Sequence, residues 1–156
     1  MINVKPKIAI RTLTEADIGA FVKLDSGAVA LVTVANEDPE KRASLAEFDK
    51  AANVFSHKLY LGEAVLTFGG ELVFEPDISS VTPAVIPTHN SGTSIFIDGE
   101  SLYIVVRINP THDFRLVDIR KGVIVKWQGR PMPVLRGWSV GVAAADGQFA
   151  RIFKAP

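Results

Sequence analysis

The chain has 156 residues, of which 47% are hydrophobic and 22% are charged, so it can bury a core and is not disordered throughout. Seventeen basic side chains balance seventeen acidic ones, which argues against a nucleic-acid partner because proteins that bind nucleic acids carry a positive excess. The absence of cysteine excludes disulfides, thiolate metal sites and cysteine nucleophiles. We expect one β-rich domain over residues 1–156.

The first part of the chain is predicted to form strands. Valine and isoleucine together total 31 residues against 11 leucines, and β-branched side chains favour sheets. Residues 8–13 form the first predicted strand, and residues 21–24 and 29–34 form a hairpin whose turn contains Gly27. Residues 17–27 resemble the first hairpin of SH3-like small barrels, so residues 1–36 are a candidate small-barrel subregion.

One amphipathic helix is predicted over about residues 40–61. Ser44 and Glu47 have the spacing of a capping box, in which the two side chains satisfy free backbone N–H groups at the start of a helix. Apolar residues recur at spacings of three and four, which places them on one face of a helix. They are Leu45, Phe48, Ala52, Phe55 and Leu59.

The remainder of the chain is predicted to be a series of hairpins. Each pair of strands flanks a turn that contains glycine, which suits the backbone conformation of tight hairpins. The pairs are 64–68 with 71–74, 94–97 with 101–106, 114–119 with 123–127, and 134–142 with 149–153. This spacing indicates an antiparallel β-barrel or β-sandwich built of consecutive hairpins, with one main helix.

The charges are segregated along the chain even though they sum to zero. Residues 59–106 carry six acidic side chains and no lysine or arginine, whereas residues 107–136 carry seven basic and two acidic side chains. The two segments either pair within one sheet and cancel, or form surfaces that meet on neighbouring subunits or steer a charged partner.

The candidate ligand-binding residues lie in or next to predicted loops. Residues 78–94 are predicted to be a long polar loop, shortened if residues 84–86 form an edge strand, and such loops often carry binding residues. The candidates are His89, Asn90, Ser91, His112 and Asp113. Imidazole and carboxylate groups suit a metal ion, but the histidine spacings match no local metal-binding motif, so no metal site is predicted.

No nucleophile elbow and no phosphate-binding loop is present. We therefore predict a non-enzymatic β domain that acts in binding or assembly through its acidic and basic surfaces, as a homo-oligomer. The alternative is a small-molecule-binding barrel or a metal-assisted enzyme with a site near His89, His112 and Asp113. Neither hypothesis identifies a cofactor. The sequence has no signal-peptide pattern and no apolar run of membrane-spanning length, so we expect a cytoplasmic protein without a membrane partner.

Overall fold

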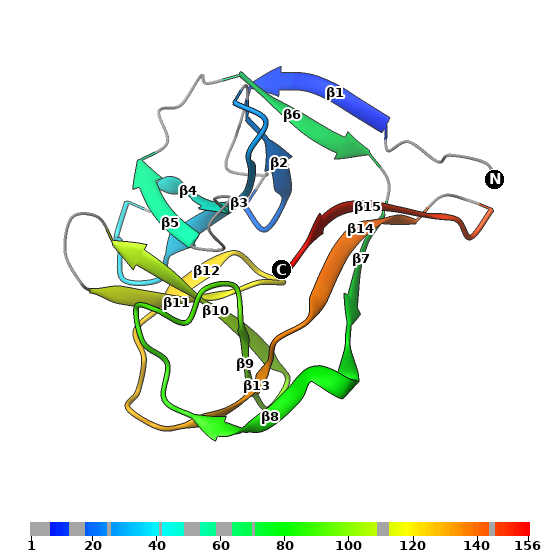
Figure 1. Cartoon of the computed structure of the whole chain (residues 1–156). Coiled ribbons are helices and arrows are strands. Elements are labelled where there is room, and N and C mark those ends of the chain that lie inside the picture. The colour runs from blue at the N-terminus through cyan, green and yellow to red at the C-terminus, as the bar shows by residue number, and fades with distance from the viewer. Residues whose placement is uncertain are drawn as a thin grey trace.

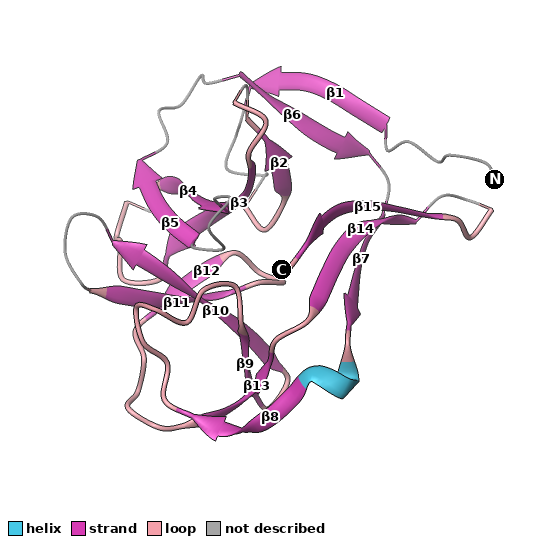
Figure 2. Cartoon of the chain, viewed as in Figure 1, coloured by secondary structure: helices cyan, strands magenta, loops and turns pink. Residues whose placement is uncertain are grey.

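The computed structural model describes residues 7–12, 18–24, 26–40, 42–48, 54–58, 64–69, 71–108, 113–143 and 146–156. The mainly β fold class is confirmed, because strands make up nearly all the regular structure of these residues (Figure 2). Their one helix is the short 3-10 helix η2 (Ile78–Ser80). No helix in these ranges has the length and apolarity needed to cross a bilayer.

The described strands form a sheet of twelve and a sheet of three. In chain order they are β1 (Lys7–Thr12), β2 (Phe21–Lys23), β3 (Val29–Ala35), β4 (Ala43–Phe48), β5 (Val54–Lys58), β6 (Ala64–Gly69), β7 (Glu71–Pro76), β8 (Val81–Val85), β9 (Ile95–Asp98), β10 (Ser101–Ile108), β11 (Phe114–Asp118), β12 (Val123–Val125), β13 (Met132–Leu135), β14 (Trp138–Ala143) and β15 (Phe149–Lys154). The smaller sheet has the order β15-β14-β7, and β8 ends the larger one.

Backbone pairings connect six strands of the larger sheet in a cycle, which we call the ring; Figure 1 labels these strands β3, β4, β5, β10, β11 and β12. Antiparallel pairings join β3 to β4 and β4 to β5, and likewise β10 to β11 and β11 to β12. Two parallel pairings connect these triplets, because β5 lies beside β10 and β12 lies beside β3. Each parallel pairing contains only two residue pairs, so these junctions are much shorter than the longest antiparallel ladders of the ring.

A bent two-stranded ribbon links the smaller sheet to the larger one. On one side of the bend β7 pairs with β14, and on the other side β8 pairs with β13. Trp138 lies opposite Pro76, and Leu135 lies opposite Val81. The four residues between Pro76 and Val81 therefore oppose only the two residues between Leu135 and Trp138. The helix η2 takes up this excess length (Figure 2).

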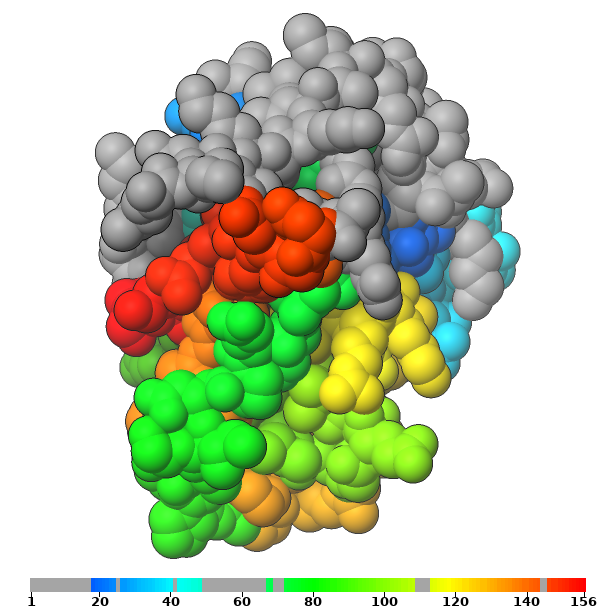
Figure 3. Space-filling view, turned by 90° about the vertical axis from the view of Figure 1, so that its right-hand side faces the viewer, coloured from blue at the N-terminus to red at the C-terminus, as the bar shows by residue number. Residues whose placement is uncertain are grey.

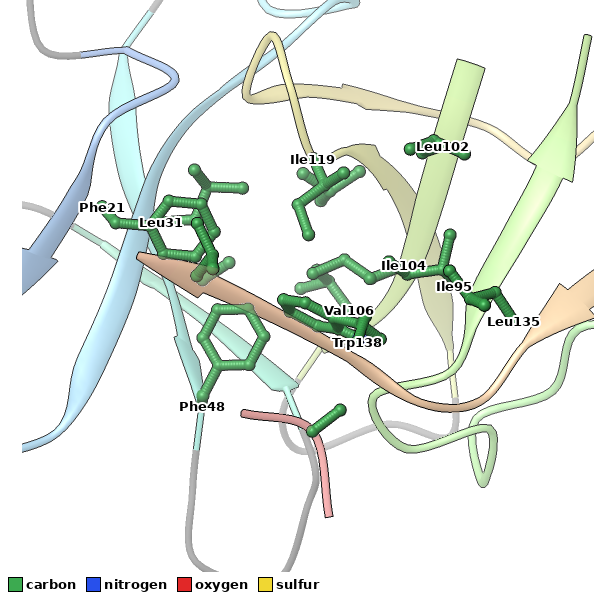
Figure 4. Packing of buried hydrophobic residues seen from close by; sticks show 14 residues of the cluster. Phe21, Leu31, Phe48, Ile95, Leu102, Ile104, Val106, Ile119, Leu135 and Trp138 are labelled. Atoms are coloured by element: carbon green, nitrogen blue, oxygen red, sulfur yellow. The ribbon is translucent and has the colours of Figure 1, made fainter. Parts of the chain in front are cut away.

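The main hydrophobic core lies between the ring and the three-stranded sheet. The ring of Trp138 contacts those of Phe48, Phe74 and Phe153, with centroids 6.1, 5.8 and 5.3 Å away. The indole N–H of Trp138 donates to the Thr93 carbonyl at 2.7 Å, so the one polar group of this buried side chain is satisfied. Figure 4 shows Trp138 and Phe48 of this group near the aliphatic side chains of Leu31 in β3 and of Ile104 and Val106 in β10.

Two smaller clusters are buried away from the main core. One contains Val22, Leu24, Ala30, Val32 and Leu45, and the other contains Phe96, Val105, Leu116, Met132 and Val134. Neighbouring residues of one strand enter different clusters, as do Leu31 and Val32 of β3. The central strands of the larger sheet are therefore buried on both faces, which explains their continuous runs of valine and isoleucine.

The helix predicted over residues 40–61 is wrong, because the described residues of this range contain β4 and β5. Leu45 and Phe48 do not share a face, since Leu45 enters a small cluster and Phe48 enters the main core. The Ser44 hydroxyl does not cap a helix but lies 2.7 Å from the hydroxyl of buried Thr33, its cross-strand neighbour. Six residue pairs between β3 and β4 outweigh the local helical preference. The predicted face residues Ala52 and Leu59 lie outside the described residues.

The predicted hairpins β2–β3, β9–β10 and β11–β12 are confirmed, but the hairpin of residues 64–68 with 71–74 is wrong. Strand β6 pairs with β1 and β2, whereas β7 pairs with β14. Phe74 accounts for this separation, because it packs against Trp138 in the core. Residues 134–142 are divided between β13 and β14, of which β14 pairs with β15 as expected. Strands β2 and β3 of the candidate subregion 1–36 also pair outside it, with β6, β4 and β12.

Gly122 allows two backbone segments to approach closely. Its φ is +69°, and an added Cβ would lie 2.5 Å from the Val32 carbonyl oxygen and 2.6 Å from the Gly19 nitrogen. Gly99 also has a positive φ, +58°, but nothing lies within 4 Å of its added Cβ.

We predict that Gly99→Ala lowers the free energy of unfolding by about 1–2 kcal/mol through backbone strain. Gly122→Ala should lower the free energy of unfolding by ~1–3 kcal/mol more than Gly99→Ala does, because its added methyl group also meets the close backbone atoms. Urea denaturation measures both variants, and equal losses would contradict this difference.

Candidate functional site

Three of the predicted binding residues, His89, Asn90 and Ser91, lie in the loop between β8 and β9, residues 86–94, which we call the His89 loop. This loop is anchored to strand β10. Arg107 donates from Nε to the His89 carbonyl at 2.6 Å and from Nη2 to the Asn90 side-chain oxygen at 2.7 Å. Ser91 is engaged within its own turn, because its hydroxyl accepts the Thr88 N–H at 2.9 Å. Thr93, in the same loop, accepts the indole N–H of Trp138. The loop is therefore held at two points, one at the sheet and one at the core.

Of the other two candidates the structure describes Asp113, which lies beside the end of β10 that carries Arg107. Asp113 is exposed, and its carbonyl accepts the N–H of Ile108 at 3.1 Å. Its neighbour Phe114 is the cross-strand partner of Arg107, which brings Asp113 to the region of the His89 loop. His112 lies outside the described residues. Among the residues that are described, no three histidine, aspartate or glutamate side chains are grouped to hold a metal ion.

A pocket that the sequence did not predict lies over β10, β11 and β12. Its volume is about 320 Å³. Its apolar lining combines two aromatic residues with three aliphatic ones from neighbouring strands, namely Tyr103, Leu116, Val125, Trp127 and Met132. Its polar lining consists of two acids, two bases and two amides, namely Glu37, Asp98, Lys126, Arg130, Asn36 and Gln128. None of these residues belongs to the His89 loop.

One wall of this pocket is the loop that follows β12, and internal contacts fix its shape. The indole N–H of Trp127 donates to the Arg130 carbonyl at 2.9 Å. The Arg130 guanidinium forms an ion pair with Asp98 at the end of β9. The Trp127 ring also packs on Phe114, with centroids 6.1 Å apart. The loop after β12 is therefore held by an internal hydrogen bond and by contacts with β9 and β11.

The turn after β3 also lines this pocket, through Asn36 and Glu37. The Asn36 N–H donates to the Ile124 carbonyl at 3.0 Å, which fixes the turn against β12. Asp38 stabilises the next residues, because its carboxylate accepts the Arg42 Nε–H at 3.1 Å and the Glu40 N–H at 3.0 Å. The hydrogen bond from Arg42, followed by that from Glu40, lowers the pKa of Asp38. Asp38 therefore stays ionised to a lower pH than an aspartate side chain without these hydrogen bonds.

The helix η2 and strand β8 form an exposed apolar surface. Four large hydrophobic residues on this segment are exposed, and we call them the β8 surface: Ile78, Val81, Val85 and Ile86. Ile78 is 77% exposed, the largest exposure of these side chains. Figure 3 shows this segment in green at the surface of the molecule. Single exposed hydrophobic residues are ordinary, but four of them within the nine residues 78–86 favour a contact surface.

Strand β8 is also an edge strand and shortens the predicted loop, but it spans Val81–Val85 and not the suggested residues 84–86. It pairs with β13 and ends the described order of the larger sheet. Pro83, in the middle of β8, has no backbone N–H to offer an added strand. A partner would therefore be expected to cover the apolar side chains rather than extend the sheet.

The acidic and basic segments cancel in part within one chain. Asp98 of the acidic segment pairs with Arg130 of the basic segment. Exposed charges of both signs remain beside the bend of the ribbon. Glu75 and Asp77 lie just before Ile78, while the N–H of exposed Arg136 donates to the Ser80 carbonyl at 3.4 Å. Both segments therefore border the β8 surface.

A scan against protein-family models, a search of curated proteins and a search of solved structures each found no match.

We predict that Arg107 keeps the His89 loop closed on the sheet. Arg107→Lys retains the charge but cannot reproduce the two-point contact with His89 and Asn90. Hydrogen–deuterium exchange at residues 89–94 should rise several-fold in this variant, because the loop opens more often. Arg115→Lys is the matched control, since the Arg115 guanidinium donates to the carbonyl of adjacent Phe114. Equal exchange in both variants would show that Arg107 does not anchor the loop.

Proposed function

We propose that this chain is a non-enzymatic β domain that works by assembly with a second copy of itself through the β8 surface. The observation that carries the proposal is the grouping of exposed Ile78, Val81, Val85 and Ile86 on one bent edge of the sheet. Covering these side chains removes apolar area from water, which favours association. The proposal includes a cytoplasmic location, because a chain without cysteine requires no oxidising compartment.

The charges around the β8 surface favour a second copy as the occupant. Glu75 and Asp77 lie on one side of Ile78, and Arg136 follows β13 across the ribbon. In a two-fold dimer each copy presents the same patch, so a border that carries both signs can match itself. A strongly acidic or strongly basic partner would meet like charges on part of this border. The segregated charges would then act at the rim and the apolar residues at the centre.

The test is the mass of the chain in solution, measured by analytical ultracentrifugation. We expect a dimer that Ile78→Asp converts to monomer, because a carboxylate in the apolar centre loses its hydration. Ser26→Asp is the matched control: it adds the same charge in the exposed turn between β2 and β3 and should leave the dimer intact.

Salt separates the two parts of this proposal. The dissociation constant should rise with salt concentration, because mobile ions screen charges at an exposed rim. A salt-independent dimer would contradict the ionic part, and a monomer at all concentrations would contradict assembly as a whole. A dimer that persists in Ile78→Asp would place the interface elsewhere.

A further inference from the structure

The pocket over β10, β11 and β12 has the construction of a small-molecule site, independent of the β8 surface. Its volume of about 320 Å³ reaches the lower end of the roughly 300–1,000 Å³ range of ligand pockets. The ion pair of Arg130 with Asp98 and the Trp127 N–H to the Arg130 carbonyl fix one wall. A ligand would therefore meet a preformed surface and would not have to order a loop.

The aromatic lining indicates a ligand that contains a planar ring. Tyr103 and Trp127 both line the pocket, together with the aliphatic Leu116. Aromatic rings pack on one another in offset or edge-to-face arrangements and add stabilisation beyond the area they bury. The Gln128 amide nitrogen donates to the Lys126 carbonyl, and the amide oxygen of this exposed side chain can accept a hydrogen bond from a polar group attached to the ring.

The charges of the lining indicate that this ligand is uncharged. Glu37 and Asp98 contribute two negative charges, and Lys126 and Arg130 contribute two positive ones. The lining is therefore neutral overall and offers no net attraction to an ion of either sign. An ionic ligand would lose hydration on entry without a net gain in return, whereas a neutral ring would not.

We propose that this pocket binds a small, uncharged aromatic compound that carries a hydrogen-bonding group. The aromatic ring of the ligand lies against Tyr103 and Trp127, and its polar group donates to the Gln128 amide oxygen. The site needs neither a metal ion nor the His89 loop, so it differs from the site that the histidines suggested.

Benzamide, benzoate and benzamidinium test the proposal, because they share one shape and carry no charge, a negative charge and a positive charge. The chain has two tryptophans, so its proton–nitrogen NMR spectrum contains two indole N–H signals, which Trp127→Phe assigns. Benzamide should shift the Trp127 signal saturably and leave that of Trp138, buried in the core, unchanged. The charged analogues should bind several-fold more weakly.

Arg130→Ala supplies the test of the wall. This variant releases the loop from Asp98 and should weaken benzamide binding on the order of tenfold. Arg151→Ala removes an exposed arginine from β15 and should leave binding unchanged. The absence of a saturable Trp127 shift would overturn the site, and tighter binding of benzoate or benzamidinium would overturn the ligand class. An equal effect of the two arginine variants would show that the wall is not part of a site.

Discussion

Trp138 is buried between the two sheets, and its packing constrains much of the remaining fold. The side chain is 3% exposed and contacts phenylalanines from β4, β7 and β15. An indole group of this size needs packing partners on every side once it is removed from water. The three-stranded sheet therefore lies against the six-stranded ring, and both supply phenylalanines that contact Trp138. Its hydrogen bond to Thr93 extends the constraint to the His89 loop, which Arg107 holds at a second point.

The same constraint explains why an apolar surface lies exposed at the bend. The chain leaves the three-stranded sheet at the end of β7, soon after Phe74 has entered the core. It must then reach β13, the partner of β8, within a few residues. Four residues on this side oppose two on the other, so the longer side bulges outward and carries Ile78 with it. Hydrogen bonds from Asp77 N–H to the Gly137 carbonyl and from Gly137 N–H to Ser80 Oγ, both 2.8 Å, hold the bulge. The partial burial of Phe74 and the exposure of Ile78 therefore both follow from the bend of the ribbon.

Local chemistry made part of this fold predictable from the sequence. Asp98-Gly99 and the turn at Gly122 specify hairpins between neighbouring segments, and the structure contains both. The predicted helix failed because Ser44 and Glu47 fit a capping box locally, while the partner of Ser44 is Thr33 on another strand. The pocket was not predictable for a similar reason, since its walls come from the turn after β3 and the loop after β12. Trp127 and Phe114 both lie in the basic segment, but the sequence does not show that their rings meet beside the pocket.

Unfolding of the Trp127→Phe variant, in which Trp138 is the remaining tryptophan, tests the shared core most directly. Trp138 fluorescence reports the junction of the two sheets, and far-ultraviolet circular dichroism reports the strands as a whole. If Trp138 joins both sheets in one core, the two signals should change at the same urea concentration and with the same slope, as in a two-state transition. Exposure of Trp138 at a lower urea concentration, with the strand signal retained, would show that the three-stranded sheet detaches on its own and would contradict the account.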